Sequence, residues 1–414
     1  ANAGNYKLTG YFESDFLGTG TTSNNNQSNS YVLRQRQIWG KAENKSGFAV
    51  TGGQMWSLVT ENGKSTDART EKLPNTIDPQ YMVGFSWTRQ PGIRLQQRFG
   101  DPKKAAFTGA VSVEQAQITG FTVASATSGA VPANFFFAGN GANGGLYNAA
   151  ASNGGTNNIT TYANNVAPDV VIKGALDLPK AHFEIGGIAR FLRDYYFPIL
   201  TVSSSNVYAY GPNYISSTRG AGGVFGSARV TTSKYLDLAV QAMAGDGVGR
   251  YGSSQLADAT LHPDGTLAPI HNYHGLFSVE GHATPKLDIF AYYGGEYAQR
   301  TVYTTATGAL LGYGAPNLSN VGCYNLPVNP AQSGAAGGSD SAVSCASPTR
   351  YIQEGMIGFT YRAINNPKYG RLQYSLTYQY LQRNLWSGLG SATTPTGPRG
   401  EDSMIHAGMR YYIP

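Results

Sequence analysis

The chain has 414 residues, and only 13% of them are charged, whereas soluble globular proteins carry about 25%. It holds 53 glycines and 28 tyrosines, its aromatic residues are spread along its whole length, and no apolar run approaches the ~20 residues of a membrane-spanning helix. With a net charge of only +6 and no Lys/Arg-rich run, this composition excludes helical membrane spans and argues against a disordered chain and a nucleic-acid binder.

The first residues of the chain, ANAG, include no initiating methionine. A processed secretory product begins in this way once its signal peptide has been removed. We therefore expect a mature, exported chain.

Segments that alternate apolar and polar residues recur from one end of the chain to the other. The clearest is residues 371–380 (RLQYSLTYQY), in which Leu and Tyr occupy one parity and Arg, Gln, Ser and Thr the other. This period of two predicts a β-strand with one apolar and one polar face. The same signature predicts fourteen strands, over residues 6–16, 30–43, 47–57, 81–99, 105–116, 168–178, 181–193, 217–232, 235–246, 271–283, 286–299, 349–363, 370–384 and 402–413.

Short turns alternate strictly with long connections. The short turns lie at residues 44–47, 101–104, 178–180, 232–234, 284–286 and 365–368, and the long connections at about 17–30, 58–80, 117–166, 194–216, 247–270, 300–348 and 385–401. Tight periplasmic turns opposite long extracellular loops are typical of outer-membrane barrels. The sequence therefore predicts a single all-β domain over residues 1–414, a transmembrane antiparallel β-barrel in the bacterial outer membrane. We expect the sheet to close into a ring, because lipid cannot satisfy an open sheet edge.

The third long connection, residues 117–166, is free of charge. No charged residue lies between Glu114 and Asp169, and Phe135–Phe137 form an apolar cluster within it. A long uncharged loop of this kind suits folding back into the barrel, so we expect it to narrow the lumen. The alternative is an extracellular loop that packs on a neighbouring subunit.

The two cysteines, Cys323 and Cys345, both lie in the connection over residues 300–348. A disulfide between them would close a loop of about 20 residues and stabilise it by roughly 3 kcal/mol. We expect this disulfide, which implies an oxidising compartment. The alternative is a pair of free thiols.

Motifs for catalysis, metals and cofactors are weak in this sequence. Residues 247–252 match GxGxxG, but no helix is predicted to follow them, so they are better interpreted as a turn. His271 and His274 lie on opposite faces of a strand with no third ligand nearby. We expect no cofactor, no metal site and no enzyme. An outer-membrane structural barrel and a β-barrel enzyme built from a distant Ser/His pair are the alternatives.

Four arginines on predicted strands are the candidate pore residues. Arg34 and Arg36 share one parity, as do Arg94 and Arg98. A charge that faced lipid at mid-bilayer would cost roughly 2–4 kcal/mol, so we expect all four to point into the lumen. Stacked guanidinium groups on a channel wall provide a positive field and bidentate donors for carboxylate or phosphate groups.

Acidic side chains accompany these arginines. Glu13 and Asp15 lie on the first predicted strand, and we count them among the pore-lining residues. The alternative for the arginines is a structural network with Glu13, Asp15 or Glu114 across the wall. The two hypotheses are compatible, because a pore can set basic and acidic walls opposite each other.

Two glutamines indicate an oligomer. Gln35 and Gln37 share the parity of Leu33 and Trp39 on the face predicted to contact lipid. An amide that faces hydrocarbon is costly unless it has a partner. We therefore expect the early strands to form a subunit interface.

Several blocks of the chain resemble one family of outer-membrane proteins. They are residues 10–18 (GYFESDFLG), 23–37 (SNNNQSNSYVLRQRQ), 51–58 (TGGQMWSL), 76–79 (TIDP), 85–90 (FSWTRQ) and 245–251 (GDGVGRY). Together they resemble the DcaP-like trimeric porins and related acidobacterial outer-membrane proteins.

The resemblance implies a homotrimer of barrels with sixteen strands each, two strands more than we count. It implies passive diffusion of small anionic solutes, dicarboxylates among them, through an arginine-bearing constriction. Its partners would be these solutes and the lipid and lipopolysaccharide of the outer membrane, with no nucleic acid. We expect Arg34, Arg36, Arg94 and Arg98 to supply the preference for anions.

Overall fold

The structure is a computed structural model, and it describes residues 2–19, 31–101, 103–119, 135–137, 165–196, 199–202, 208–210, 212–213, 215–304, 308, 310–318, 320, 323, 347–389 and 397–414. Within these residues no helix is long and apolar enough to cross a bilayer. Most of the predicted constriction loop, residues 117–166, lies outside the described residues, and so does Cys345. Cys323 takes part in a disulfide bond, and its pairing with Cys345 stays a prediction.

One antiparallel sheet makes up most of the molecule. Its fourteen long strands are β2 (Tyr6–Thr19), β3 (Tyr31–Asn44), β4 (Phe48–Trp56), β5 (Arg89–Asp101), β6 (Ala105–Glu114), β8 (Asp169–Leu178), β9 (Ala181–Tyr196), β12 (Ile215–Ser233), β13 (Leu236–Asp246), β16 (His271–Thr284), β17 (Leu287–Ala298), β20 (Thr349–Asn366), β21 (Gly370–Leu385) and β22 (Arg399–Tyr412). Each pairs with the next in this order, so the predicted all-β fold and the count of fourteen strands are confirmed.

Shorter elements complete the described chain. β1 (Asn2–Ala3) pairs with β2, β7 (Phe135–Phe137) pairs with β9, and three small hairpins are formed by β10 (Ile199–Val202) with β11 (Tyr208–Tyr210), β14 (Ala259–Leu261) with β15 (Leu267–Pro269), and β18 (Thr301–Thr304) with β19 (Leu310–Tyr313). Two 3-10 turns, η1 (Pro79–Tyr81) and η3 (Gly249–Tyr251), lie in connections between long strands.

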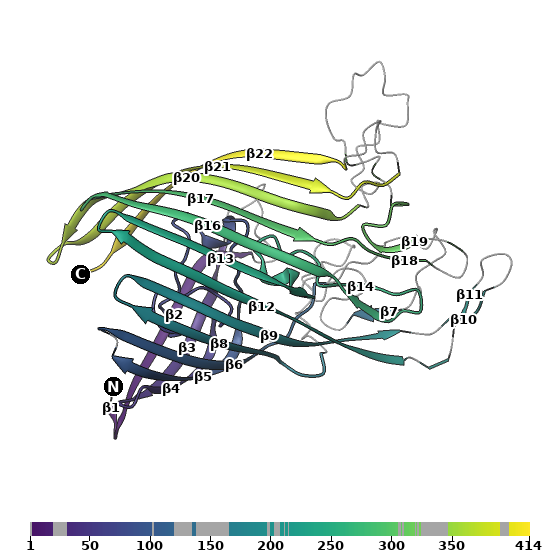
Figure 1. Ribbon diagram of the computed structural model, residues 1–414, viewed down its shortest axis with the longest axis horizontal. Coiled ribbons are helices and arrows are strands. Elements are labelled where there is room, and N and C mark those ends of the chain that lie inside the picture. The colour runs from purple at the N-terminus through teal and green to yellow at the C-terminus, as the bar shows by residue number, and fades with distance from the viewer. Residues whose placement is uncertain are drawn as a thin grey trace, which may run out of the picture.

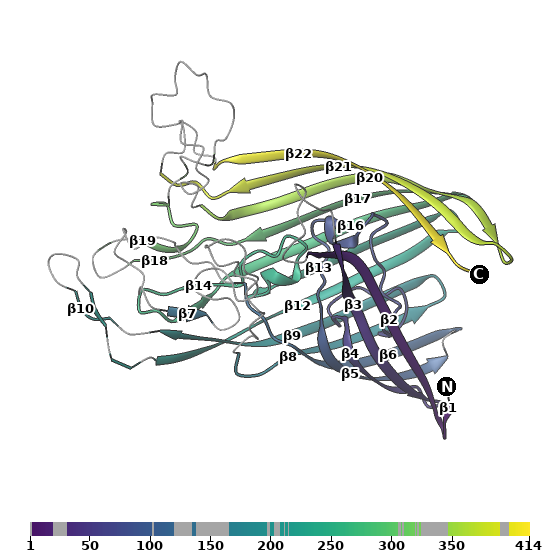
Figure 2. The ribbon, with the colours of Figure 1, turned by 180° about the vertical axis from the view of Figure 1, so that it is seen from behind.

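The sheet curls strongly about its long axis (Figures 1 and 2). The short turns lie at one end together with both termini, and the long connections lie at the other end (Figure 1). This is the predicted arrangement of a barrel with one short-turn rim and one long-loop rim.

Among the described residues, the hydrogen-bonded ladder runs from β1 to β22, and no pair there joins β22 to β2. The two edge strands run at an angle to each other (Figure 2). Residues 73–79 of the β4–β5 connection line the same cavity as β2 and β22, so this connection lies between the two edges. The barrel-type fold is therefore confirmed, whereas the closure of the ladder between β22 and β2 stays a prediction.

Side chains on the sheet are arranged inside out relative to a soluble protein. On the outer face Ile185 is 74% exposed and Ile405 71% exposed, while on the inner face Arg94 and Lys173 are each 1% exposed. β21 shows the alternation directly, because Leu376 is exposed and its neighbour Thr377 is buried. An apolar outer band with a polar interior is the pattern of an outer-membrane barrel.

Candidate functional site

The lumen is occupied by the β4–β5 connection, residues 57–88, which we call the lumen loop. Its two ends carry the apolar residues that hold it inside: Leu58 and Met82 are fully buried, and so is Phe85. Met82 and Phe85 belong to a buried cluster with Leu276 of β16 and Phe290 of β17. The sequence placed the start of β5 at residue 81, but residues 81–88 belong to this loop because their apolar side chains pack across the lumen.

Five carboxylates of the barrel wall accept hydrogen bonds from backbone N–H groups of the lumen loop. The pairs are Leu58 N to Glu114 Oε1 (2.9 Å), Asn62 N to Glu184 Oε1 (3.1 Å), Ser65 N to Asp177 Oδ1 (3.1 Å), Val83 N to Glu354 Oε2 (2.8 Å) and Gly84 N to Glu296 Oε1 (2.9 Å). The acceptors come from β6, β9, β8, β20 and β17, so the loop is anchored across much of the wall. Hydrogen bonds to charged acceptors are roughly twice as strong as neutral ones.

Arg94 and Arg98 both point into the lumen, as predicted, but they hold the lumen loop. Arg94 donates to the carbonyl oxygens of Thr66 (2.8 Å) and Trp56 (2.7 Å). Arg98 donates to Asp67 Oδ2 at 2.5 Å and to a serine hydroxyl of the same loop at 3.1 Å. Their donors are therefore directed at protein groups.

Asp67 is the centre of this clamp. It also contacts Lys41, and Gln96 donates to its Oδ1 at 2.6 Å. Burial alone would raise the pKa of Asp67, but the bonds to Lys41 and the charge of Arg98 outweigh burial and lower it. Asp67 therefore stays ionised and ties the loop to β3 and β5.

Arg34 and Arg36 form an ion-pair network with the predicted acids. Arg34 Nη2 lies 2.7 Å from Asp15 Oδ2, Arg36 Nε lies 2.7 Å from Glu13 Oε1, and Arg36 Nη1 lies 2.8 Å from Asp15 Oδ2. Arg36 Nη1 also lies 3.0 Å from Asp78 Oδ2 of the lumen loop, a partner that sequence reasoning missed. The predicted pairing with Glu13 and Asp15 is present.

A β-bulge changes the facing of the residues next to this network. The β2–β3 register shifts between Glu13 and Ser14, so that Glu13 pairs with Gln37 and Ser14 with Gln35. Gln35 is exposed on the outer face, as expected. The outward position that we expected for Gln37 is wrong: it is buried, and its Nε2 donates to Glu13 Oε2 at 2.5 Å. The extra residue of the bulge reverses the alternation along β3.

A cavity of about 600 Å³ lies between the two edges of the sheet and the lumen loop, and we call it the inner cavity. Its lining includes Arg36 and Asp15 of the ion-pair network, Arg69 of the lumen loop, and Thr360 and Arg410 on the short-turn halves of β20 and β22. The cavity is therefore polar and charged on both sides.

A second cavity, of about 360 Å³, lies along the same wall nearer the long-loop end, and we call it the outer cavity. Thr349, Arg383 and Met404 line it on the sheet side. Val83 of the lumen loop and Ser254 of the β13–β16 connection line it on the opposite side. The two cavities thus lie in series along β20–β22.

η1 separates the two cavities. Pro79 lines the inner cavity, and Tyr81 lines the outer one. The Tyr81 ring stacks on His406 of β22, with ring centroids 5.8 Å apart and an interplanar angle of 14°. Tyr81 is 47% exposed and lines the outer cavity, so this ring pair is only partly buried.

Three arginines along this path enter no ion pair among the described residues. Arg69 lies over the Tyr11 ring with 4.0 Å to its centroid, Arg410 Nη1 lies 3.4 Å from the Tyr412 hydroxyl, and Arg383 Nε donates to Thr349 Oγ1 at 2.8 Å. Since a guanidinium carries five N–H donors, each has donors left for a solute. Sequence reasoning missed all three, because Arg69 lies in a connection and neither Arg383 nor Arg410 has a second arginine two or four residues away, as the predicted arginines do.

Glu61 of the lumen loop is a charge that depends on pH. Burial raises the pKa of Glu61 to about 7, against the lowering effect of Arg229, whose Nη2 lies 3.1 Å from Oε1. Its charge therefore changes near neutral pH.

The described residues contain no group of three or more His, Cys, Asp or Glu side chains placed to hold a metal ion. His271 lies 2.7 Å from Asp246 Oδ1, whereas His274 is buried and approaches the Val248 carbonyl at 3.1 Å. The two histidines face opposite sides of β16, as the sequence predicted.

No family model and no curated protein matches the sequence. Among solved structures, the chain is similar to the outer membrane channel DcaP of Acinetobacter baumannii, with 13% identity, 98% of this chain and 82% of that chain covered, and a TM-score of 0.57. It also matches OmpT, an outer membrane protein of Vibrio cholerae, at 7% identity, with 100% and 86% covered and a TM-score of 0.41. A FadL homologue of Pseudomonas aeruginosa matches at 10% identity, with 97% and 84% covered and a TM-score of 0.33.

The first of these similarities shows the fold. The chain has the porin-type fold of bacterial outer-membrane β-barrels, in agreement with the inverted distribution of apolar and polar side chains. The predicted porin-type fold is thereby confirmed.

Proposed function

We propose that the chain is an outer-membrane channel through which small solutes, preferably anionic ones such as dicarboxylates, diffuse passively. The observation that carries this proposal is the pair of cavities in series along β20–β22, beside the lumen loop and the part of the β13–β16 connection that packs on it. A folded-in loop that leaves a narrow polar path is a means of selecting solutes by size and charge.

The preference for anions follows from the arginines outside the ion pairs. Arg36 is offset by Glu13, Asp15 and Asp78, so its field at the path is largely cancelled. Arg69, Arg383 and Arg410 enter no ion pair among the described residues, and Glu71 lines the inner cavity beside Arg69 and Arg410. At 4 Å and an effective dielectric constant of about 20, each is worth about 4 kcal/mol to a monoanion, against about 1 kcal/mol in bulk water.

The spacing of these arginines along the path favours elongated anions with two charges. Arg410 and Arg69 line the inner cavity, and Arg383 lines the outer one beyond η1. A dicarboxylate that crosses η1 would leave one guanidinium as it meets the next, which keeps binding weak enough for release.

We further propose a DcaP-like homotrimer that contacts its neighbours through the early strands. Exposed Gln35 on the outer face of β3, next to exposed Leu33, supports this interface. Its Nε2 lies 3.5 Å from Gln54 Oε1, a weak contact that leaves the amide able to bond a neighbouring subunit. Native mass spectrometry in mild detergent should show trimers, and monomers alone would contradict the proposal.

The test of function is planar-bilayer conductance with reversal potentials in a salt gradient. The wild type should conduct and favour anions, and a variant carrying Arg69→Gln, Arg383→Gln and Arg410→Gln should lose most of this preference at low salt. A matched control removes three positive charges from the short-turn rim, away from both cavities: Lys103→Gln, Lys180→Gln and Lys234→Gln. Absence of conductance would refute the channel, and an equal loss in both variants would refute the role of the three arginines.

A further inference from the structure

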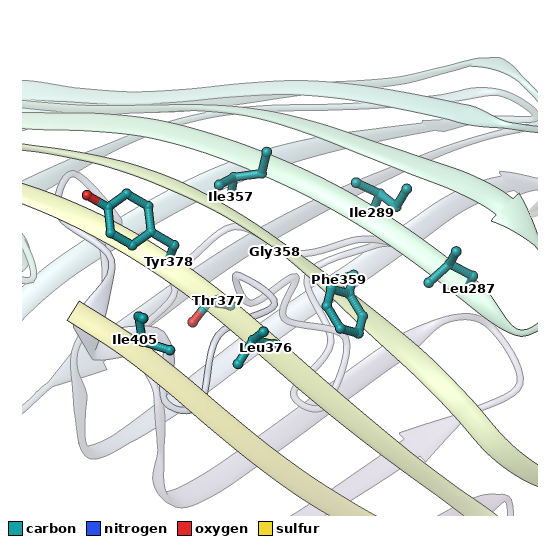
Figure 3. Close-up of a pocket in the computed structure, with 9 residues that line it drawn as sticks. All are labelled: Leu287, Ile289, Ile357, Gly358, Phe359, Leu376, Thr377, Tyr378 and Ile405. Carbon is teal, nitrogen blue, oxygen red and sulfur yellow. The ribbon is translucent and has the colours of Figure 1, made fainter. Parts of the chain in front are cut away.

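The outer face of the sheet carries an apolar groove that belongs to neither cavity. It spans β17, β20, β21 and β22 and has a volume of about 540 Å³ (Figure 3). Its lining includes Leu287, Ile289, Ile357, Phe359, Leu376 and Ile405. Ile289 pairs with Phe359 and Phe359 with Leu376, so one row of outward-facing side chains crosses the groove.

The short-turn rim beside this groove is basic. Each of the six short turns carries one or two exposed lysines: Lys45, Lys103, Lys104, Lys180, Lys234, Lys286 and Lys368. The lysine ion pairs within the described chain involve other lysines, namely Lys41, Lys72 and Lys173. Seven unpaired ammonium groups therefore surround one end of the barrel.

The groove and the basic rim meet at the β16–β17 turn. Leu287, at one end of the groove, directly follows Lys286 (Figure 3). The turn is fixed on both sides: Lys286 N donates to Thr284 Oγ1 at 3.2 Å, and Arg362 N donates to the Lys286 carbonyl at 2.8 Å. The backbone of Lys286 is thus fixed at the end of the groove, and its exposed side chain starts from there.

We propose that this groove, with Lys286, binds one anionic phospholipid of the membrane leaflet at the short-turn rim. The acyl chain would lie along the groove and the phosphate would meet the ammonium group of Lys286, with Lys368 on the next turn as a second cation. An apolar groove that ends at an unpaired cation complements an amphiphile with an anionic headgroup. The inference rests on the proposed function as an outer-membrane channel. In such barrels the short turns face the periplasm.

The charge is what distinguishes this site from general contact with lipid. Any apolar outer surface contacts acyl chains, but only a cation at the end of the groove discriminates an anionic from a zwitterionic headgroup. A lysine near an anionic membrane surface is worth about a fivefold change in affinity, or about 1 kcal/mol. That effect is large enough to measure with one substitution.

The experiment is native mass spectrometry of the detergent-purified, full chain with added phosphatidylglycerol or phosphatidylcholine of the same acyl chains. The wild type should retain one phosphatidylglycerol in preference to phosphatidylcholine, and Lys286→Gln should lower its retention about fivefold. The matched control, Lys180→Gln, removes the same charge from the β8–β9 turn and should leave retention unchanged. Ile357→Trp, which fills the groove from an already exposed apolar position, should lower retention of both lipids.

Each other outcome overturns the inference in a defined way. Equal loss in Lys286→Gln and Lys180→Gln would mean that the rim attracts anions without a site. Full displacement by glycerol phosphate, which has the headgroup charge but no tail, would show that the groove does not contribute to binding. Equal retention of the two lipids would show that the cation does not contribute. Bilayer conductance of Lys286→Gln keeps the two proposals apart, because a channel that conducts normally but retains no lipid contradicts only the lipid site.

Discussion

Replacement of Arg94 by alanine should loosen the lumen loop while leaving the barrel intact. Arg94 is 1% exposed, and its guanidinium donates to the carbonyl oxygens of Thr66 in the loop and of Trp56, the last residue of β4 before the loop. A hydrogen bond to a charged group contributes about 1.5–3 kcal/mol, so the change removes about 3–6 kcal/mol of contacts that fix the loop and the strand end from which it starts, and it leaves two carbonyls without this donor. The five carboxylate anchors remain, so the loop should stay inside the barrel.

The consequence for the channel can be worked out from the lower figure. A local loss of about 3 kcal/mol raises the population of undocked loop conformations about a hundredfold, since each 1.4 kcal/mol is a factor of ten. Single-channel recordings of Arg94→Ala should then show a larger mean conductance and more current noise than the wild type. Arg94→Lys keeps the charge but reaches the carbonyls with one compact group. Its mean conductance and current noise should therefore lie between those of the wild type and Arg94→Ala.

Two results would refute this reasoning. If Arg94→Ala inserts and conducts with wild-type amplitude and noise, then the loop does not bound the solute path. If its conductance rises but cleavage by added protease within residues 57–88 does not, then the change acts on the path by its charge alone. In that second case Arg94→Lys, which keeps the charge, should conduct like the wild type.

Three other predictions follow from the site. The carboxyl of Glu61, with a pKa of about 7, is mostly neutral at pH 6 and mostly charged at pH 8, so anion preference from reversal potentials should fall as the pH rises, and Glu61→Gln should abolish the step. Arg36→Ala leaves Asp15 and Asp78 without their shared partner. It should therefore lower the free energy of unfolding by about 1–3 kcal/mol, measured by thermal unfolding, and shift selectivity toward cations. A weakened anion preference without destabilisation would mean that Arg36 acts on solutes directly. Tyr81→Ala should widen the passage between the two cavities and raise the uptake rate of larger solutes in a liposome-swelling assay. An unchanged rate would mean that η1 does not limit passage.

The strands were predictable because their signal is local. Each long strand carries its own period of two, and five of the six short turns carry Pro, Asn or Gly beside lysine, so fourteen strands follow from residues close in sequence. The bulge at Arg36 was not predictable, since one extra residue in β3 is visible only against its partner β2. The outward prediction for Gln37 therefore failed while that for Gln35, two residues earlier, held.

The lumen loop escaped prediction for a different physical reason. Its middle is rich in Lys, Asp, Glu and Arg, which in a connection normally indicates exposure to water. Glu61, Asp67, Lys72 and Asp78 of the loop pair with charged residues of the wall, as in the ion pair of Lys72 and Glu280 at 2.6 Å. Apolar residues at both ends of the loop, such as Leu58 and Phe85, were the available signal, because an exposed loop does not carry them in such number.

The carboxylate anchors of the lumen loop are distributed unevenly around the wall. The carboxylates that accept loop N–H groups come from β6, β8, β9, β17 and β20, whereas β21 and β22 supply none of them. The contacts of these two strands with the loop are weaker: Gln379 of β21 donates to Thr76 Oγ1 at 3.3 Å, and His406 of β22 stacks on Tyr81. Arg383 and Arg410 lie on these two strands and line the two cavities. Most of the carboxylates that hold the loop thus lie away from the part of the wall that carries both cavities, where we propose that solutes pass.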